Sequence, residues 1–103
     1  MASEAERKLN EVYGWSVEEV NFGREDEPDV DGCVLVNYVG DGVAAKVAAR
    51  PGLSKERRAG FAAWALQILE RFIEHGPEFD GWQKRSDEGW QLWGRVHQLP
   101  SAD

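Results

Sequence analysis

The side chains that could carry catalytic chemistry are few, and their spacing does not bring them together. Cys33 is the single cysteine of the chain, and His75 and His97 are its two histidines. A nucleophilic cysteine needs a histidine or another group nearby that lowers its pKa, and no sequence pattern ties either histidine to Cys33. Because cysteine is among the residue types most often buried, we interpret Cys33 as an inert core residue. The sequence therefore predicts a non-enzyme, and an active site around Cys33 or His97 is the weakest of three hypotheses.

Metal and cofactor sites are not indicated either. Two separated histidines lack the ligand spacing of a metal centre, and one cysteine is too few for a thiolate cluster or an internal disulfide. Glu70 and Glu74 are four residues apart in a predicted helix, where a solvated polar face explains both carboxylates. We expect neither a metal ion nor a cofactor.

The densest group of charges is an acidic segment that precedes a predicted strand. Carboxylates packed this densely repel one another, so we expect a solvated loop rather than core. The segment also lacks the spacing of an EF-hand calcium loop. Two interpretations stay open: an ordinary solvated loop, and a surface that mimics phosphates and docks on a basic partner protein. The carboxylates are Glu25, Asp26, Glu27, Asp29 and Asp31.

A basic cluster opens the longest predicted helix. Lys55, Arg57 and Arg58 follow Ser54 directly, apart from Glu56. The order helix, three strands, helix over residues 4–72, with this cluster at the second helix, resembles the double-stranded-RNA-binding domain. The resemblance implies that the three cations would hold phosphates, as a lysine-rich turn does in that family. The chain departs from the pattern of that family at two points. Glu56 interrupts the basic cluster, and the acidic segment stands where the family has the loop that enters the minor groove.

A second resemblance covers more of the chain. The order α-β-β-β-α-β-β in a small acidic protein is similar to the class of type III secretion chaperones, without a shared motif. That class forms homodimers that bind unfolded effector segments, so the resemblance implies dimerisation and protein binding.

Tryptophan and arginine are the residue types that dominate interface hot spots. In the last predicted strand Trp93 alternates with Trp90 and Leu92, so we expect Trp93 to face outward while the other two face the core. Trp64, at the edge of the long helix's apolar side beside Arg71, is the second exposed candidate. The predicted partner-binding residues are Trp93, Arg95, Trp64, Arg71 and the five carboxylates of the acidic segment.

Apolar periodicity places one long helix at the centre of the fold. Ser54 is suited to cap its start, and Gly76 followed by Pro77 is a strong stop. From Phe61 onward the apolar residues recur on one side with the period of a helix. The pattern predicts a helix over residues 54–75, about 33 Å long, laid on a sheet.

Local signals also define the other elements. The capping-box pattern of Ser3 and Glu6 predicts a first helix, and the Asp-Gly dipeptide at residues 41–42 predicts a hairpin turn. A helical turn that begins at Ser16 remains the alternative to the first strand. The expected elements are a helix at residues 2–13, strands at 15–22, 33–39 and 43–50, and a second hairpin from 82–85 and 89–99.

The order α-β-β-β-α-β-β predicts an α+β fold, in which an antiparallel sheet of about five strands carries both helices on one face. We expect the opposite face to carry Val34, Val36, Tyr38 and Trp93. Such an apolar face needs a cover, and a second copy of the chain would supply it as a homodimer.

Composition and charge narrow the function. The apolar fraction of 42% and charged fraction of 30% indicate a folded domain, which we assign to residues 1–103. No apolar run is long enough for a membrane span and the start lacks a signal-peptide core, so we expect a cytoplasmic protein. The net charge of −7 disfavours nucleic acid and anionic membranes but permits a basic protein partner.

Our first hypothesis is a non-enzymatic protein-binding domain of the inhibitor, immunity or adaptor type, which docks on a partner protein as a homodimer. A phage anti-defence inhibitor fits this size and charge by analogy. The alternatives are a nucleic-acid-binding module that uses the basic cluster and a secretion-chaperone-like dimer.

Overall fold

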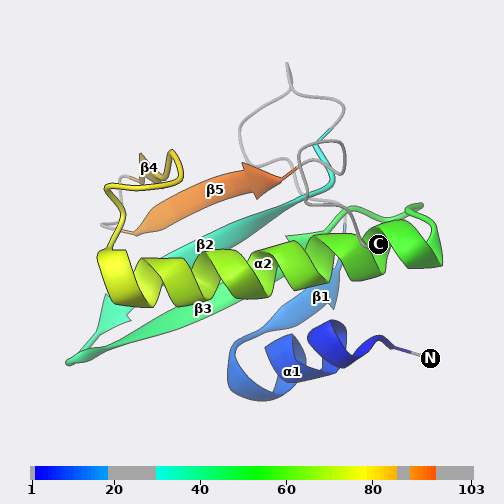
Figure 1. Cartoon of the computed structure of the whole chain (residues 1–103), viewed down its shortest axis with the longest axis horizontal. Helices are drawn as coiled ribbons and strands as arrows, with labels where there is room; N and C mark the ends of the chain where they lie inside the picture. The colour runs from blue at the N-terminus through cyan, green and yellow to red at the C-terminus, as the bar shows by residue number, and fades with distance from the viewer. Residues whose placement is uncertain (1, 19–29, 86–88, 95–103) are drawn as a thin grey trace.

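Both predicted helices and all five predicted strands are present, in the expected α+β order (Figure 1). The structure is a computed structural model, and it describes residues 2–18, 30–85 and 89–94. The elements are α1 (Glu4–Val12), β1 (Trp15–Val17), β2 (Gly32–Val39), β3 (Gly42–Ala49), α2 (Lys55–His75), β4 (Gln83–Lys84) and β5 (Trp90–Gly94).

The start of α1 is fixed by the predicted capping box. The Ser3 hydroxyl accepts a hydrogen bond from the Glu6 backbone N–H at 3.2 Å, and Glu6 Oε2 accepts one from the Ser3 N–H at 3.0 Å. Two N–H groups that the helix leaves without partners are thereby satisfied. Leu9 is fully buried, but the apolar side chain of Val12 is exposed. The buried side of α1 is therefore shorter than its apolar residues predict.

The long helix α2 begins and ends where the sequence predicts. The Ser54 hydroxyl accepts a hydrogen bond from the Arg57 N–H at 3.1 Å, and Gly76 ends the helix with φ of 83°. Not every apolar residue of the periodic pattern is buried, because Ile73 in the last turn is exposed. The buried side consists of Phe61, Ala62, Ala65, Ile68, Leu69 and Phe72.

The strand order in the sheet is β1-β3-β2-β5-β4. Three of the four strand pairs are antiparallel, but β1 runs parallel to β3, with Trp15 opposite Val47. A short hairpin loop would force two strands to be antiparallel neighbours, whereas the 14 residues between β1 and β2 impose no such constraint. The predicted antiparallel sheet is therefore confirmed for four of its five strands, and β1 joins it in parallel. Of the strand predicted at residues 15–22, residues 19–22 lie outside the described part.

The β2–β3 hairpin turns one residue earlier than predicted. Val39 pairs with Gly42, so Gly40 and Asp41 are the two loop residues. Gly40 has a φ of +61°, and Asp41 is not among the residues with positive φ. A glycine at the first central position is the pattern of a type II′ turn, which suits the twist of a hairpin.

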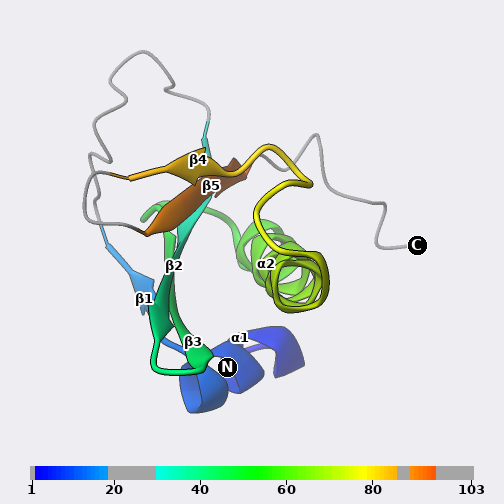
Figure 2. The same cartoon turned by 90° about the vertical axis from the view of Figure 1, so that its left-hand side faces the viewer.

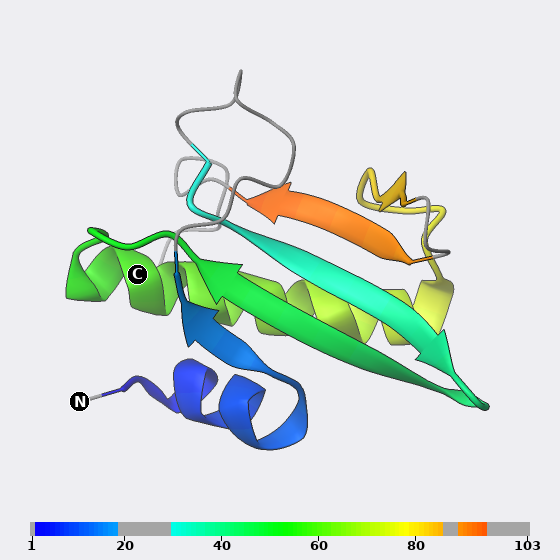
Figure 3. The ribbon, with the colours of Figure 1, turned by 180° about the vertical axis from the view of Figure 1, so that it is seen from behind.

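The closed end of this hairpin extends past its neighbouring strands (Figure 3). On one side β5 pairs only with Gly32–Val36, and on the other β1 pairs only with Val47–Ala49. Among the described strands, none flanks residues 37–46, which we call the hairpin end.

Both helices lie on one face of the sheet, as predicted (Figures 1 and 2). The face assignment of β2, however, is the reverse of the expectation. Val34 and Val36 are buried beneath α2, and the Tyr38 ring lies 5.8 Å from the Phe72 ring. Gly32 explains why this set of alternate β2 residues faces α2. A Cβ at residue 32 would lie only 2.5 Å from Phe61 Cζ, so no larger residue fits against the helix there.

The opposite face is mixed rather than apolar. Strand register places Cys33, Leu35, Ala48 and Trp93 on it together with the polar Lys46. Cys33 and Ala48 are nevertheless buried. The apolar face that suggested a homodimer is thus not present as expected, and dimerisation stays a prediction without that support.

The two helices were also considered as possible membrane spans. In the portion of the chain that the structure describes, neither helix combines the length and the apolar character that crossing a bilayer requires.

Candidate functional site

The potentially catalytic residues are separated from one another. Cys33 is fully buried, and its Sγ lies 3.7 Å from the Val34 carbonyl oxygen. His75 ends α2 and meets the Phe79 ring edge-on at 5.3 Å between ring centres. His97 lies outside the described residues. Within those residues no three His, Cys, Asp or Glu side chains gather as metal ligands would.

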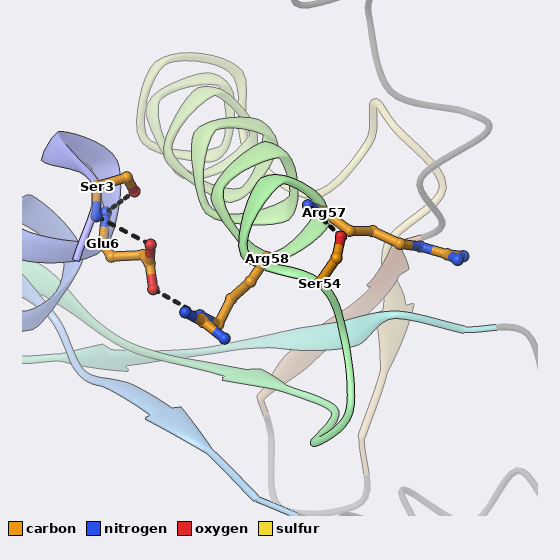
Figure 4. Close-up of polar contacts among 5 residues, drawn as sticks. All are labelled: Ser3, Glu6, Ser54, Arg57 and Arg58. Carbon is orange, nitrogen blue, oxygen red and sulfur yellow. Dashed lines mark hydrogen bonds and ion pairs between the residues drawn. The ribbon is translucent and has the colours of Figure 1, made fainter. Parts of the chain in front are cut away.

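Two arginines of the basic cluster at the first turn of α2 are engaged in ion pairs, and Figure 4 shows the pair of Arg58 with Glu6. Arg58 Nε lies 3.0 Å from Glu6 Oε1, and Arg57 Nη2 lies 3.0 Å from Asp31 Oδ1. Both carboxylates are buried, so the two arginines tie α2 to α1 and to the start of β2. The contact of Arg57 is an ion pair by distance and lacks the geometry of a hydrogen bond. Of the three predicted phosphate ligands, Lys55 alone is exposed and outside an ion pair within the described part.

Opposing effects act on the Glu6 carboxyl. Burial raises the pKa of Glu6, but hydrogen bonds from Ser3 and the charge and hydrogen bond of Arg58 lower it by more. The net pKa lies below the ordinary value, so the carboxylate stays ionised and holds Arg58. Glu6 thus acts in capping and in tethering α2.

Asp31 is the one residue of the acidic segment that the structure describes, and it is not solvated. Its side chain is fully buried, and its backbone N–H donates to the Gly94 carbonyl at 2.7 Å. The expectation of a wholly solvated segment is wrong at Asp31, because Arg57 supplies a charge partner that the local sequence does not reveal. Glu25, Asp26, Glu27 and Asp29 lie outside the described residues.

The predicted partner-binding residues do not form one surface. Trp64 is half-buried and packs on Phe61, with ring centres 5.6 Å apart, and against Gly94. Trp93 is half-buried on the opposite face of the sheet rather than openly exposed. Arg71 Nε contacts both carboxylate oxygens of Asp80 at 3.0 Å. Arg95 lies outside the described residues.

A groove opens at the hairpin end, against the last turns of α2. Its volume is about 280 Å³. Tyr38 and Val43 face each other across the hairpin and form one wall, while Phe72 and Ile73 form the other. We call it the hairpin-end groove, and its lining residues are Tyr38, Asp41, Gly42, Val43, Phe72, Ile73 and Gly76.

Exposed apolar side chains gather at the same end of the molecule. The exposed fractions are 57% for Tyr38, 60% for Val39, 56% for Ile73 and 50% for Phe79. All four belong to the hairpin end, to the last turns of α2 or to the segment just after α2. The hairpin end leaves them uncovered because no strand flanks it within the described residues. A concentration of this kind marks an interaction surface more often than chance exposure does.

Carboxylates accompany these apolar side chains. Arg71 is the arginine of the last turns of α2, and its hydrogen bonds to Asp80 hold the pKa of Arg71 above its ordinary value. Asp41, Glu70 and Glu78 form no ion pair with any residue in the described ranges. Asp41 lines the groove, and Glu70 and Glu74 lie on α2 within about 100° of Ile73 around the helix axis. We call these three carboxylates the acidic rim.

The groove was not identified from the sequence, although one signal pointed to it. Apart from Asn37, strand β2 stays apolar through Tyr38 and Val39 up to the turn. A hairpin that ended level with its neighbouring strands would carry polar residues there. Whether such residues are covered depends on where β1 and β5 end, and the sequence of β2 does not contain that information.

Comparison with known proteins adds no relative: no family model, no curated protein and no solved structure matches the chain. Neither resemblance suggested by the order of elements gains support from these comparisons.

Proposed function

We propose that the chain is a non-enzymatic protein-binding domain that docks on a partner protein through the hairpin-end groove. The observation that carries the proposal is that Tyr38 and Ile73, two exposed apolar side chains, line this groove. We retain an inhibitor, immunity or adaptor role in the cytoplasm as the setting of this function, which a single buried cysteine fits.

The energetic argument rests on Tyr38 and Ile73, which line the groove. Covering each would remove on the order of 100 Å² of apolar surface from water, a gross gain of about 2.5 kcal/mol per side chain. The cost of association consumes part of this gain. An aromatic anchor such as Tyr38 is the type of residue that dominates measured interfaces.

The lining of the groove favours binding over catalysis. Asp41 and Tyr38 are its only polar side chains. General acid–base and nucleophilic catalysis both need a pair of groups in hydrogen-bond reach, and no hydrogen bond joins these two residues in the described structure. The proposal therefore assigns the groove a recognition role.

Site-specific photo-crosslinking tests this proposal. A photoreactive phenylalanine analogue placed at Ile73 should capture a partner protein in cells, because residue 73 borders the groove. The same analogue at Ala63, which is exposed on the polar side of α2, is the matched control. Tyr38→Asp should abolish the crosslink from position 73. Equal crosslinking from both positions, or none from 73, would contradict the proposal.

A further inference from the structure

We infer that the occupant of the hairpin-end groove is a basic segment of another protein, which places one large apolar side chain in the groove and lysine or arginine side chains against the acidic rim. The inference rests on the proposed protein-binding function and adds the chemistry of the partner.

The first step is the charge balance at this end of the molecule. The acidic rim brings three carboxylates to the hairpin tip and the last turns of α2. Arg71, the arginine of these turns, is already bonded to Asp80, and Glu74 Oε1 lies 3.5 Å from Nε2 of the neighbouring His75. Carboxylates this close repel one another in the free protein. Cations supplied by a partner relieve that repulsion and also steer its approach.

The second step is the position of the carboxylates relative to the apolar anchors. Glu70 and Glu74 are four residues apart on α2, and both lie on the same side of Ile73, at roughly 60° and 100° from it around the helix axis. Asp41 lines the groove from the hairpin side. A side chain bound beside Ile73 therefore has carboxylates on both sides, and the matching ligand pattern is an apolar residue between cations.

The third step is the size of the groove. A volume of about 280 Å³ is comparable with that of one or two large side chains. An amphipathic helix docks through several anchors spread along a longer groove. The dimensions therefore favour a short segment with a single apolar anchor.

The same charges argue against a second copy of this chain as the occupant. Two copies that met at their hairpin ends would bring together two acidic rims, in a chain whose net charge is −7. Nucleic acid is disfavoured at this surface for the same reason. A second copy is an outcome that the experiment below detects.

The test measures binding of a fluorescein-labelled peptide with one leucine between four lysines by fluorescence anisotropy. Comparison peptides replace the leucine by glycine or the lysines by glutamates. We expect the lysine–leucine peptide to bind most tightly and its affinity to fall with added salt. Loss of two rim charges in Asp41→Asn plus Glu74→Gln should weaken it about two- to twentyfold at low salt, since one exposed ion pair is worth roughly 1.4- to fivefold.

A matched control separates the groove from the overall charge. Glu11→Gln plus Glu56→Gln removes the same number of charges from exposed positions on α1 and on the first turn of α2. We expect this control to bind within twofold of the unmodified protein. Ile73→Ser should weaken binding of the leucine peptide and leave the glycine peptide unchanged. Equal effects of the two double variants, or equal binding of the leucine and glycine peptides, would overturn the inference.

The outcomes also distinguish this inference from the function on which it rests. If the basic peptide fails to bind while position 73 still crosslinks a partner, the binding function stands and the basic chemistry is wrong. If both fail, the proposed function is wrong. A dimer in sedimentation that Tyr38→Asp dissociates would identify a second copy as the occupant and overturn the inference.

Discussion

The two ends of α2 use charge in opposite ways. At the first turn, Arg57 and Arg58 each lie 3.0 Å from a buried carboxylate, of Asp31 and Glu6 respectively. At the last turns, Glu70 forms no ion pair with any described residue, Glu74 Oε1 lies 3.5 Å from Nε2 of the neighbouring His75, and the apolar side chains of Tyr38 and Ile73 are exposed beside a groove.

The difference shows that two charge clusters of one helix can have different structural roles. A cation with a buried partner is committed to holding the fold, whereas a charge without a partner is available to another molecule. The basic first turn of α2 suggested a binding surface from the sequence, yet Arg57 and Arg58 are already in ion pairs. The last turns border the groove for which we propose a binding role.

The largest expected effect is at the first turn. Arg57→Met removes the partner of fully buried Asp31. We expect the free energy of unfolding to fall by about 3 kcal/mol, the lower end for a broken buried pair, because the Arg57 side chain is itself 42% exposed. Urea unfolding at pH 7 measures the loss. Lys55→Met, a neighbouring exposed cation, should change stability by less than about 0.5 kcal/mol. Similar losses in the two variants would mean that Asp31 does not depend on Arg57.

A smaller, pH-dependent effect is expected at Glu6. Its folded-state pKa is depressed, so its contribution is present above the ordinary value of 4.5 and is lost as pH falls through the folded-state pKa. Glu6→Gln should lower the free energy of unfolding by about 1–2 kcal/mol at pH 7. The gap to the unmodified protein should close below pH 4.5.

Thermal unfolding followed by circular dichroism from pH 3 to pH 7 measures this gap. Glu4→Gln, an exposed change in the same first turn of α1, serves as the control and should show little pH dependence of its own. A gap that stays constant across the pH range would show that the Glu6 carboxylate charge is not what tethers Arg58.

The smallest effect compares the two ends directly. Glu74 is exposed near the C-terminus of α2, where a negative charge opposes the helix dipole, and Glu56 lies in the first turn, where it is favoured. Glu74→Gln should therefore stabilise the protein by about 0.3–0.5 kcal/mol, and Glu56→Gln should destabilise it by a similar amount. Differential scanning calorimetry at pH 7.5 resolves both shifts. Shifts of the same sign would refute the proposed difference between the two ends.

Local signals explain what the sequence predicted well. Ser54, Gly76 and the capping box of Ser3 and Glu6 act through hydrogen bonds and backbone angles within a few residues, so both helices have nearly the predicted bounds. The second hairpin was likewise recognised from its polar turn, and its strands pair antiparallel as expected.

Contacts distant in sequence explain what was missed. The direction of β1 depends on β3, some 30 residues later, and the face assignment of β2 depends on how closely Gly32 approaches Phe61. Asp31 is buried because Arg57 reaches it from another element. The hairpin-end groove depends on the lengths of β1 and β5, so no single segment encodes it.

The short outer strands have a consequence for solubility. Strand edges with free backbone groups are templates for aggregation, and β1 and β4, with three and two residues, offer little length for another strand to join. The hairpin end is the longer stretch without a flanking strand in the described sheet. Asp41 at its tip and the neighbouring carboxylates repel the same end of another copy, which disfavours edge-to-edge joining of two chains at this stretch.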